Sequence, residues 1–362
     1  MNTVITVTLN PALDQTVRVA NLTPGDVNRA ESLEFNAGGK GVNVAGCLAD
    51  YGVGTIVTGL LGAQDSAAFD ALFAAKRIDD RFVRVPGRTR INVKLVDTAR
   101  HETTDINLAT TPPAPACVEA LEKRIAELAR PGRWCVLAGS LPPGVDPSFY
   151  RRMTRVLHDA GVHVALDTSG APLTEALAAT DPRDLPDLVK PNQAELEALL
   201  GRALDDDEAI IAAACELVAR GIRYVVVSLG GRGAIGVMAS QPPAGLPAVS
   251  RAVSRVVPLQ SGATKAASRA APPVFQIFRA TPPRVPVAST VGAGDAFVAG
   301  LIASLIEART WDDAGRQATA FAAAKLARVG PHLPDHATLA ALAARVEVET
   351  FTLSAADGVV QP

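Results

Sequence analysis

The run Ser289 to Phe297, which reads Ser-Thr-Val-Gly-Ala-Gly-Asp-Ala-Phe, holds the residues best suited to chemistry in this sequence. The apolar residues that follow, up to Ile306, have the length and composition of a buried helix. We therefore expect Gly292, Ala293 and Gly294 to form a tight turn at a helix N-terminus. Unpaired N–H groups and the helix dipole make such a turn suitable for binding a phosphate.

Asp295 would lie in the first turn of that helix, with its carboxylate beside the expected phosphate site. Two anions repel each other, so this placement makes sense if the carboxylate takes a proton from a hydroxyl group that attacks the phosphorus. An aspartate that merely caps a helix would give the same pattern. The run favours phosphoryl transfer, and helix capping is the structural alternative.

A second glycine-rich run, Gly38 to Asn43, precedes a small-residue segment that we expect to be helical. Gly39 would let a ligand approach the backbone, while Lys40 and Asn43 add a cation and an amide. This combination suits a sugar phosphate; the alternative is a lysine in a surface turn. The run is not a phosphate-binding Walker A loop, because the upstream glycine and the Ser or Thr after the lysine are missing.

Two further segments carry candidate substrate-binding groups. Asp14 follows the first predicted strand, where its carboxylate could accept hydrogen bonds from two sugar hydroxyls; an Asx or proline turn is the alternative. Arg90 and Lys94 lie in a predicted strand and could bind a substrate phosphate, unless that strand face is simply solvated.

Asn192 and Glu195 stand three residues apart at the start of a predicted helix, after the loop that holds Lys190. On one helix face they could hold a hydrated Mg²⁺ beside a nucleotide. An N-cap Asn with a Glu three residues later is equally typical of a helix capping pair. The sequence leaves both readings open.

Residues 231–236 match the GxGxxG pattern of dinucleotide-binding folds. That fold requires a helix next and an acidic residue about 20 positions later. The following residues turn away from a helical pattern, and no Asp or Glu occurs from Leu217 to Gly294. A dehydrogenase is therefore disfavoured.

Short apolar runs alternate with longer segments of helical period, which predicts an α/β fold with a parallel sheet covered on both faces. The expected strands are 4–9, 134–138, 162–166, 188–189 and 224–227, and the expected helices include 117–129, 147–160, 193–200 and 208–219. Polar or glycine-rich loops follow four of these strands. Because ligands bind at the carboxyl ends of parallel strands, these loops should rim one cleft.

Three segments break this alternation. Residues 15–35 and 82–108 hold short alternating strands, which predict a small β-sheet that serves as a lid. Residues 241–276 are rich in Pro, Ala, Ser and Arg, and we interpret them as a mobile basic insertion. A tail, 351–362, follows a single domain of 1–350.

Composition excludes several classes of protein. The chain has 362 residues, of which 48% are apolar and 20% charged, and its net charge is −2, so no overall basic field recruits nucleic acid or a membrane surface. The four cysteines form no CxxC pair and the five histidines no metal-binding spacing. No signal segment or membrane-length apolar run occurs, and a cytoplasmic protein is expected.

Nine motifs in sequence order resemble those of the ribokinase-like, PfkB-type carbohydrate kinases, and most of all the bacterial 1-phosphofructokinases among them. They are TLNPALD (8–14), AGGKGVNVA (37–45), GRTRINVKL (87–95), TDIN (104–107), AGSLPPGV (138–145), LDTSG (166–170), LVKPNQAEL (188–196), VVVSLGGRGA (225–234) and STVGAGD (289–295). The resemblance implies a three-layer αβα sandwich with a mainly parallel central sheet and a small β-sheet lid, often the dimer contact. It also implies that ATP, with Mg²⁺, phosphorylates D-fructose 1-phosphate to fructose 1,6-bisphosphate.

The resemblance also assigns roles to individual residues. Asp295 matches the catalytic base, and Glu195 matches a residue that organises Mg²⁺ through water. The substrate-binding positions are Asp14, Gly39, Lys40, Asn43, Arg90 and Asn107. The nucleotide and anion-hole positions are Lys190, Asn192, Ser228, Gly230, Gly231, Gly233, Thr290, Gly292, Ala293 and Gly294.

The sequence departs from the family pattern at Ala296-Phe297, in the tail after Phe351, and at two places near the expected nucleotide. Residues 241–276 have no counterpart that we identify, and Phe321 to Lys325 replace a stretch that is usually small and apolar near the nucleotide. Tagatose 6-phosphate or fructose 6-phosphate remain alternative acceptors, and a sugar-phosphate sensor without turnover is the alternative of another class.

Overall fold

The chain folds around one large, mainly parallel sheet. The computed structural model describes residues 3–100, 102–240, 274–328 and 330–354. The strand order of the sheet is β15-β14-β13-β12-β11-β10-β9-β1-β4-β5, and β6 also pairs with β4. The strands are β1 (Thr3–Thr8), β4 (Gly54–Gly62), β5 (Asp79–Asp80), β6 (Val83–Val85), β9 (Trp134–Ala138), β10 (His163–Asp167), β11 (Leu188–Val189), β12 (Tyr224–Ser228), β13 (Ala234–Ala239), β14 (Val274–Thr281) and β15 (Glu347–Ser354).

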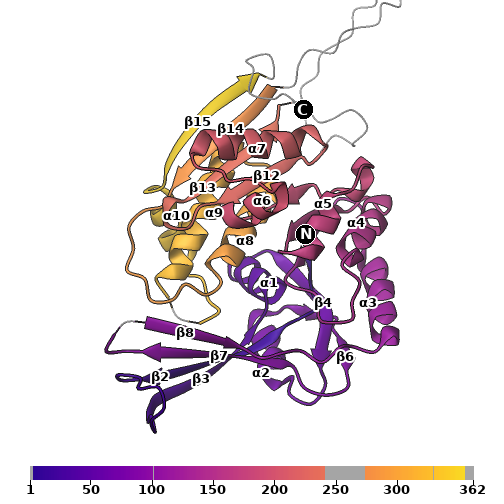
Figure 1. Cartoon of the computed structure of the whole chain (residues 1–362). Coiled ribbons are helices and arrows are strands. Elements are labelled where there is room, and N and C mark those ends of the chain that lie inside the picture. Colours follow the sequence, from indigo (N-terminus) through magenta and orange to yellow (C-terminus); the bar gives the residue numbers. More distant parts are fainter. Residues whose placement is uncertain (1–2, 101, 241–273, 329, 355–362) are drawn as a thin grey trace, which may run out of the picture.

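Helices cover both faces of this sheet, which gives three layers (Figure 1). Successive residues of β9 show why: Cys135 and Leu137 pack into one core cluster, and Trp134 and Val136 into another. One face carries α3 (Pro115–Leu128), α4 (Phe149–Asp159), α5 (Ala171–Leu177), α6 (Gln193–Leu200) and α7 (Asp207–Ala219). The other carries α1 (Lys40–Asp50), α2 (Ala67–Lys76), α8 (Ala293–Ile306), α9 (Trp311–Leu326) and α10 (His336–Ala343). The predicted αβα sandwich is confirmed.

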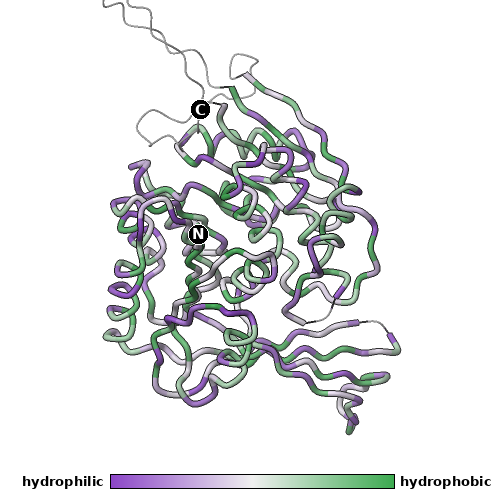
Figure 2. Tube along the Cα trace, turned by 180° about the vertical axis from the view of Figure 1, so that it is seen from behind, coloured by the Kyte–Doolittle hydropathy of each residue, from purple (hydrophilic) through white to green (hydrophobic). Residues whose placement is uncertain are grey.

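A second sheet of four strands projects from the sandwich (Figure 1). Its order is β3 (Ala30–Gly38), β2 (Ala12–Val19), β7 (Arg90–Asp97) and β8 (Glu102–Asn107). Hydrophilic and hydrophobic residues alternate along these strands (Figure 2), as expected for a sheet whose two faces differ. β2 pairs with β7 in parallel, so the sheet joins two segments far apart in the sequence.

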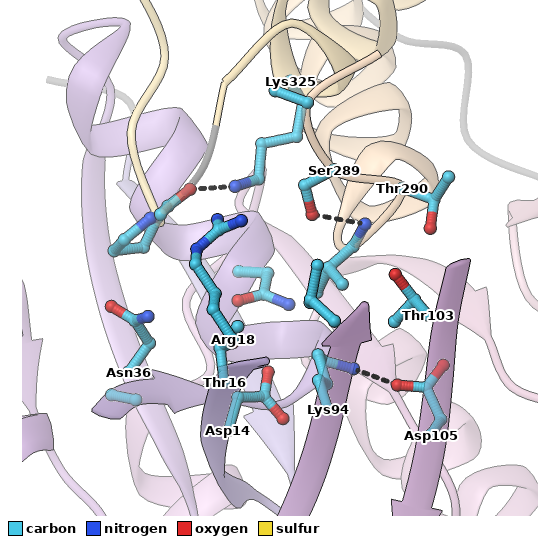
Figure 3. A pocket seen from close by; sticks show the side chains of 17 residues that line it. Asp14, Thr16, Arg18, Asn36, Lys94, Thr103, Asp105, Ser289, Thr290 and Lys325 are labelled. Carbon is cyan, nitrogen blue, oxygen red and sulfur yellow. Dashed lines mark hydrogen bonds and ion pairs between the residues drawn. The ribbon is translucent and has the colours of Figure 1, made fainter. Parts of the chain in front are cut away.

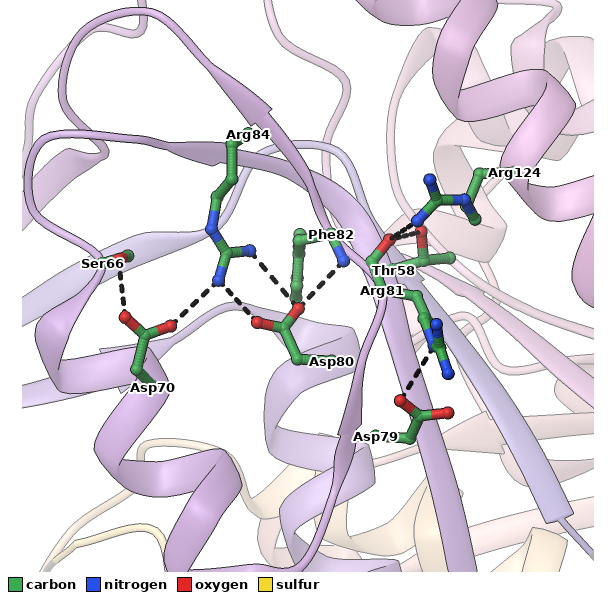
Figure 4. A network of polar contacts seen from close by, with 9 residues as sticks. All are labelled: Thr58, Ser66, Asp70, Asp79, Asp80, Arg81, Phe82, Arg84 and Arg124. Atoms are coloured by element: carbon green, nitrogen blue, oxygen red, sulfur yellow. Dashed lines mark hydrogen bonds and ion pairs between the residues drawn. The ribbon is translucent and has the colours of Figure 1, made fainter.

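The expected lid segment 82–108 is too long at its start. Val83–Val85 pair with β4 of the main sheet instead, next to the salt-bridge network in Figure 4. There Arg84 lies within 2.9 Å of Asp70 and 2.5 Å of Asp80. These ion pairs fix β6 to the sandwich, and the projecting strand begins only at Arg90.

The expected boundaries near the C-terminus also differ. Residues 351–354 belong to β15, which pairs antiparallel with β14, so they are not part of a tail. Residues 274–276 open β14, because Phe275 and Ile277 alternate into the core. The rest of the expected insertion, 241–273, and of the tail, 355–362, lies outside the described residues. Among the described helices, none combines the length and apolar character needed to cross a membrane.

Candidate active site

The expected glycine turn lies at the start of α8. Gly292 is the N-cap residue and adopts a left-handed backbone conformation, φ 76°, which side chains disfavour. Ala293 and Gly294 open the helix, so their N–H groups belong to the unpaired first turn. Lys190 Nζ would lie only 3.8 Å from a Cβ atom at Gly294. Gly294 is exposed, so this part of the turn is accessible to a ligand and lies near a cation.

Asp295 is buried in the first turn of α8, and Asn43 from α1 holds its carboxylate. Asn43 Nδ2 donates a hydrogen bond to Asp295 Oδ2 at 2.7 Å. Burial, together with the nearby charge of Asp167, raises the pKa of Asp295 to about 6. A carboxyl group with such a pKa can accept a proton near neutral pH and is a suitable general base.

A second buried carboxylate, Asp167, lies at ion-pair distance from Lys40 and Lys190, the two lysines that the sequence analysis assigned to the site. Lys40 Nζ lies 2.9 Å and Lys190 Nζ 3.4 Å from Asp167 Oδ1. Burial alone would raise the pKa of Asp167, but the two ammonium groups hold it below its ordinary value. Sequence reasoning gave Asp167 no role of its own, although it directly follows a predicted strand, where ligand-binding residues gather.

The small sheet contributes a chain of polar side chains. Asn92 Nδ2 donates to Asp14 Oδ1 at 3.0 Å, and Arg90 Nη1 donates to Asn92 Oδ1 at 2.7 Å. Burial raises the pKa of Asp14 against the opposing effects of Lys94, Asn92 and Arg90. Asn107 pairs with Asn92 across the sheet but is exposed. Arg90 also donates to the carbonyl of Asn10, so its guanidinium is partly engaged.

A pocket of about 200 Å³ lies between the small sheet and the α8 turn (Figure 3). It brings Asp14 and Asn43 together with Thr290 of the Ser289–Phe297 run. Sequence reasoning missed several polar residues of its lining, since the alternation of one strand does not reveal which face meets a cleft. These are Thr16, Arg18, Asn36, Thr103 and Asp105.

The predicted nucleotide loops meet at the ends of β11 and β12. An isolated bridge pairs Asn192 with Ser228, and a one-turn helix, η2 (Gly230–Arg232), follows β12. Gly233 then leads directly into β13, so the GxGxxG run does not open a helix, as the sequence indicated. Gly230 and Gly233 both have positive φ. A Cβ atom at Gly231 would meet no other atom within 4 Å, so the backbone there is open to solvent or a ligand.

Asn192 and Glu195 form a capping box at the start of α6. Asn192 Oδ1 accepts from Glu195 N, and Glu195 Oε2 accepts from Asn192 N, each at 2.8 Å. The helix-capping interaction that the sequence left open is therefore present. In the described part of the chain, the other carboxylate oxygen, Glu195 Oε1, has no hydrogen bond. The charge of Glu195 also acts on Lys40, which places it at the edge of the same site.

The described residues hold no group of three or more His, Cys, Asp or Glu side chains that could bind a metal alone. Asp167 Oδ2 is buried and lacks a hydrogen-bond partner. Carboxylate oxygens such as this one and those of Glu195 are the ligands that Mg²⁺ prefers, and a Mg²⁺ ion carried mainly by phosphates would keep most of its waters and need few of them.

Comparison with known proteins agrees with this arrangement. The family model described as pfkB family carbohydrate kinase matches residues 7–253 and 265–337. The 1-phosphofructokinase of Rhodobacter capsulatus is 42% identical over 349 residues, which cover 96% of this chain and 98% of the relative. The 1-phosphofructokinase of Xanthomonas campestris is 43% identical over 323 residues, covering 89% and 90% of the two chains.

Solved structures share the fold over nearly the whole length. Phosphofructokinase-2 from Escherichia coli, in complex with substrates and products, superposes with a TM-score of 0.78 and 28% identity, covering 94% of this chain and 98% of that one. A possible 1-phosphofructokinase from Thermotoga maritima has a TM-score of 0.75 at 23% identity, over 97% of this chain and 100% of its own. With a family model covering most of its sequence and relatives above 40% identity, the chain belongs to the pfkB family of carbohydrate kinases.

Proposed function

We propose that this protein is an ATP-dependent sugar-phosphate kinase that phosphorylates the 6-hydroxyl of D-fructose 1-phosphate to give fructose 1,6-bisphosphate and ADP. The observation that carries the proposal is Asp295, a buried carboxylate with a pKa of about 6, set in the glycine turn that opens α8. The two relatives above 40% identity, both named 1-phosphofructokinase, support fructose 1-phosphate as the acceptor.

In the proposed reaction, Asp295 accepts the proton of the 6-hydroxyl while that oxygen forms a bond to the γ-phosphorus of ATP. The bond between the γ-phosphorus and the β–γ bridging oxygen breaks, and ADP leaves with the electron pair. The N–H groups at Gly292–Gly294 and the ammonium groups of Lys40 and Lys190 stabilise the charge of the transferred group. Asn43 orients the base through its 2.7 Å hydrogen bond.

We propose that the sugar phosphate lies between the two sheets, against the pocket-lining face of the small sheet. Asp14 would accept hydrogen bonds from sugar hydroxyls. Gly39 would present only its backbone to the ligand, because its φ of 120° and the close approach of Thr8 and Pro11, at 3.0 and 3.1 Å from a Cβ position, leave no room for a side chain. Arg90, Lys94 and Asn107 lie on the strands that would hold the acceptor phosphate and close over it. Exclusion of water there suppresses hydrolysis of ATP.

The nucleotide would lie along the loops after β11 and β12, where Lys190, Asn192, Ser228, Gly230, Gly231 and Gly233 gather, and reach Thr290 and the α8 turn. Bound Mg²⁺ would neutralise the phosphates, and Glu195 would hold it through water. The capping box positions the Glu195 carboxylate for that contact without using both of its oxygens.

A coupled assay of ADP release tests the acceptor. Fructose 1-phosphate, fructose 6-phosphate and tagatose 6-phosphate are compared at equal concentration, and the product is identified by phosphorus NMR. We expect the highest kcat/KM with fructose 1-phosphate. A preference for either 6-phosphate would replace the proposed acceptor, and binding without ADP release would favour a sensor.

We also propose that two copies pair through the outer face of the small sheet. The register aligns Phe35, Gln15, Val93 and Ile106 in one row across the four strands, on the face opposite Asp14. Phe35 is 54% and Ile106 47% exposed, which is unusual for large apolar side chains in a row. An isologous contact would bury them.

The four cysteines are free thiols, and three of them are buried. Free thiols suit a reducing compartment, and we propose that the protein acts in the cytoplasm. Nothing in the proposed reaction calls for nucleic acid or a membrane.

A further inference from the structure

Lys325 is a buried cation in the wall of the proposed active-site pocket. It belongs to the last turn of α9 and is only 5% exposed. Its side chain lines the same pocket as Ser289 and Thr290, and its Nζ points away from these two residues (Figure 3) and donates a hydrogen bond to the carbonyl of Gly330. It stands at one of the places where the sequence departs from the pattern of the family.

The aliphatic part of Lys325 packs against the glycine turn that opens α8. A Cβ atom at Gly292 would lie 3.1 Å from Lys325 Cε, 3.6 Å from Asn43 Nδ2 and 3.8 Å from Asp295 Oδ2. One point at the turn is therefore within 4 Å of the lysine, of the base and of the amide that holds the base. Any anion bound at the turn would lie close to this lysine.

Lys325 differs from the other buried lysines of the described chain in having no carboxylate partner. Lys190 lies near Asp167, and Lys76 Nζ is 2.5 Å from Asp50 Oδ1. Among the described residues, no acidic oxygen lies within the 4.0 Å ion-pair distance of Lys325, and only one of its three N–H donors has an acceptor. Burial accordingly lowers the pKa of Lys325.

A buried ammonium group without a counter-ion is costly for a folded protein. This cost is offset when an anion enters the site, because the ammonium then gains both a charge partner and acceptors for its free N–H groups. The anion that fits the neighbouring helix N-terminus is a phosphate.

We propose that the Lys325 ammonium contacts the phosphoryl group held in the Gly292–Gly294 turn and stabilises its charge during transfer. This inference rests on the proposed kinase function and adds to it a third phosphate-binding lysine, beside Lys40 and Lys190. Lys325 approaches from α9, whereas Lys40 and Lys190 meet at Asp167 on the sheet side. Lysine ammonium groups would thus approach the transferred phosphoryl group from two sides.

The substitution Lys325→Met tests this role, because Met retains much of the packing against Gly292 and removes only the charge. We expect kcat with fructose 1-phosphate to fall by about 10²–10³-fold, as for the loss of one oriented electrostatic donor. The KM for the sugar phosphate should change much less than kcat, because the proposed contact of Lys325 is with the transferred phosphoryl group. The ligand-free melting temperature should stay unchanged or rise, because the uncompensated charge is gone.

A second readout does not depend on turnover. ATP with Mg²⁺, without sugar phosphate, should raise the melting temperature of the wild type more than that of Lys325→Met. The control Lys76→Met removes another lysine whose side chain is largely buried, 5% exposed, but which does not line the pocket. This substitution should lower the melting temperature and leave kcat unchanged. This control separates loss of a buried lysine from loss of the phosphate contact.

The possible failures are distinguishable. If the wild type releases no ADP with fructose 1-phosphate, the proposed function fails. If the wild type turns over and Lys325→Met matches it in kcat and in ATP-induced stabilisation, the role of Lys325 alone is overturned. A variant that loses ligand-free stability and activity together, as a purely structural lysine would, overturns it as well.

Discussion

Asp295, the proposed catalytic base, is a buried carboxyl group whose ionisation costs the folded protein stability. A carboxyl group with a folded-state pKa of about 6, against an ordinary value of 3.8, binds its proton more tightly in the folded protein than in the unfolded one. Stability from this group is therefore present at low pH and is lost as pH rises through about 6.

The substitution Asp295→Asn should consequently stabilise the ligand-free protein by about 1–3 kcal/mol at pH 8. The same variant should lose about 10²–10⁴-fold in kcat, because no proton acceptor remains. Urea unfolding at pH 8 and at pH 4 measures the first effect, and the gain should vanish at pH 4, where Asp295 is protonated anyway. A less stable variant at pH 8, or near-normal turnover, would contradict the assignment.

The pH dependence of the reaction follows from the same group. A base works only when deprotonated, so kcat/KM should be constant above pH 7 and fall about tenfold per unit below about pH 6. Initial rates between pH 5 and 8, with saturating coupling enzymes at every pH, give the profile. A flat profile down to pH 5 would mean that Asp295 is not the titrating base.

At the scale of elements, the conformation of the α8 turn should matter for both folding and chemistry. Gly292→Ala forces a side chain into the left-handed region, at a cost of about 1–2 kcal/mol. Its Cβ would also lie 3.1 Å from Lys325 Cε, so the lysine side chain would have to shift by a few tenths of an ångström. We expect lower stability together with a marked loss of kcat.

Gly52→Ala is a matched control for this substitution. Gly52 has a similar φ, 88°, follows α1 and has no atom within 4 Å of a Cβ position. It should lose comparable stability in thermal unfolding yet retain its turnover. If both variants kept full kcat, the turn would tolerate displacement and its role as an anion site would fail.

The elements that sequence predicted well are those with strong local signals. The buried strand 134–138 and the helix 193–200 occur with the expected boundaries, because apolar runs and capping residues define their ends. β14 was missed because its alternating Phe275, Ile277 pattern follows a long unpatterned stretch. β6 was assigned to the wrong sheet, since three residues carry no information on their partner strand.

The residues of the candidate site also differ in whether a local sequence pattern reveals them. Asp295 and the glycine turns were predictable because they are local patterns. The role of Asp167 depends on Lys40 and Lys190 meeting there from different elements, at 2.9 and 3.4 Å. No local pattern encodes such a convergence, and the same holds for Lys325 against Gly292.

For the whole molecule, the small sheet has two faces of different composition. Asp14, Lys94 and Asp105 lie on the face that lines the pocket. The residues next to them in sequence, including Val93 and Ile106, point to the opposite face. A contact on the outer face would therefore hold the pocket-lining face, where we propose that the substrate binds, in place.

Phe35→Glu should convert the proposed dimer into a monomer. In an isologous contact each substitution acts twice, so losing about 2 kcal/mol of burial per Phe weakens association by about 10³-fold. Sedimentation velocity at micromolar concentration measures the change. Val27→Glu is the control, because Val27 is 82% exposed in the loop between β2 and β3 and outside the row. A monomeric wild type, or a dimer that survives Phe35→Glu, would refute the proposed contact.

If the dimer is lost, the KM for fructose 1-phosphate should rise more than the KM for ATP. The reason is that Asp14 and Asn92 lie on strands whose position the dimer contact would stabilise.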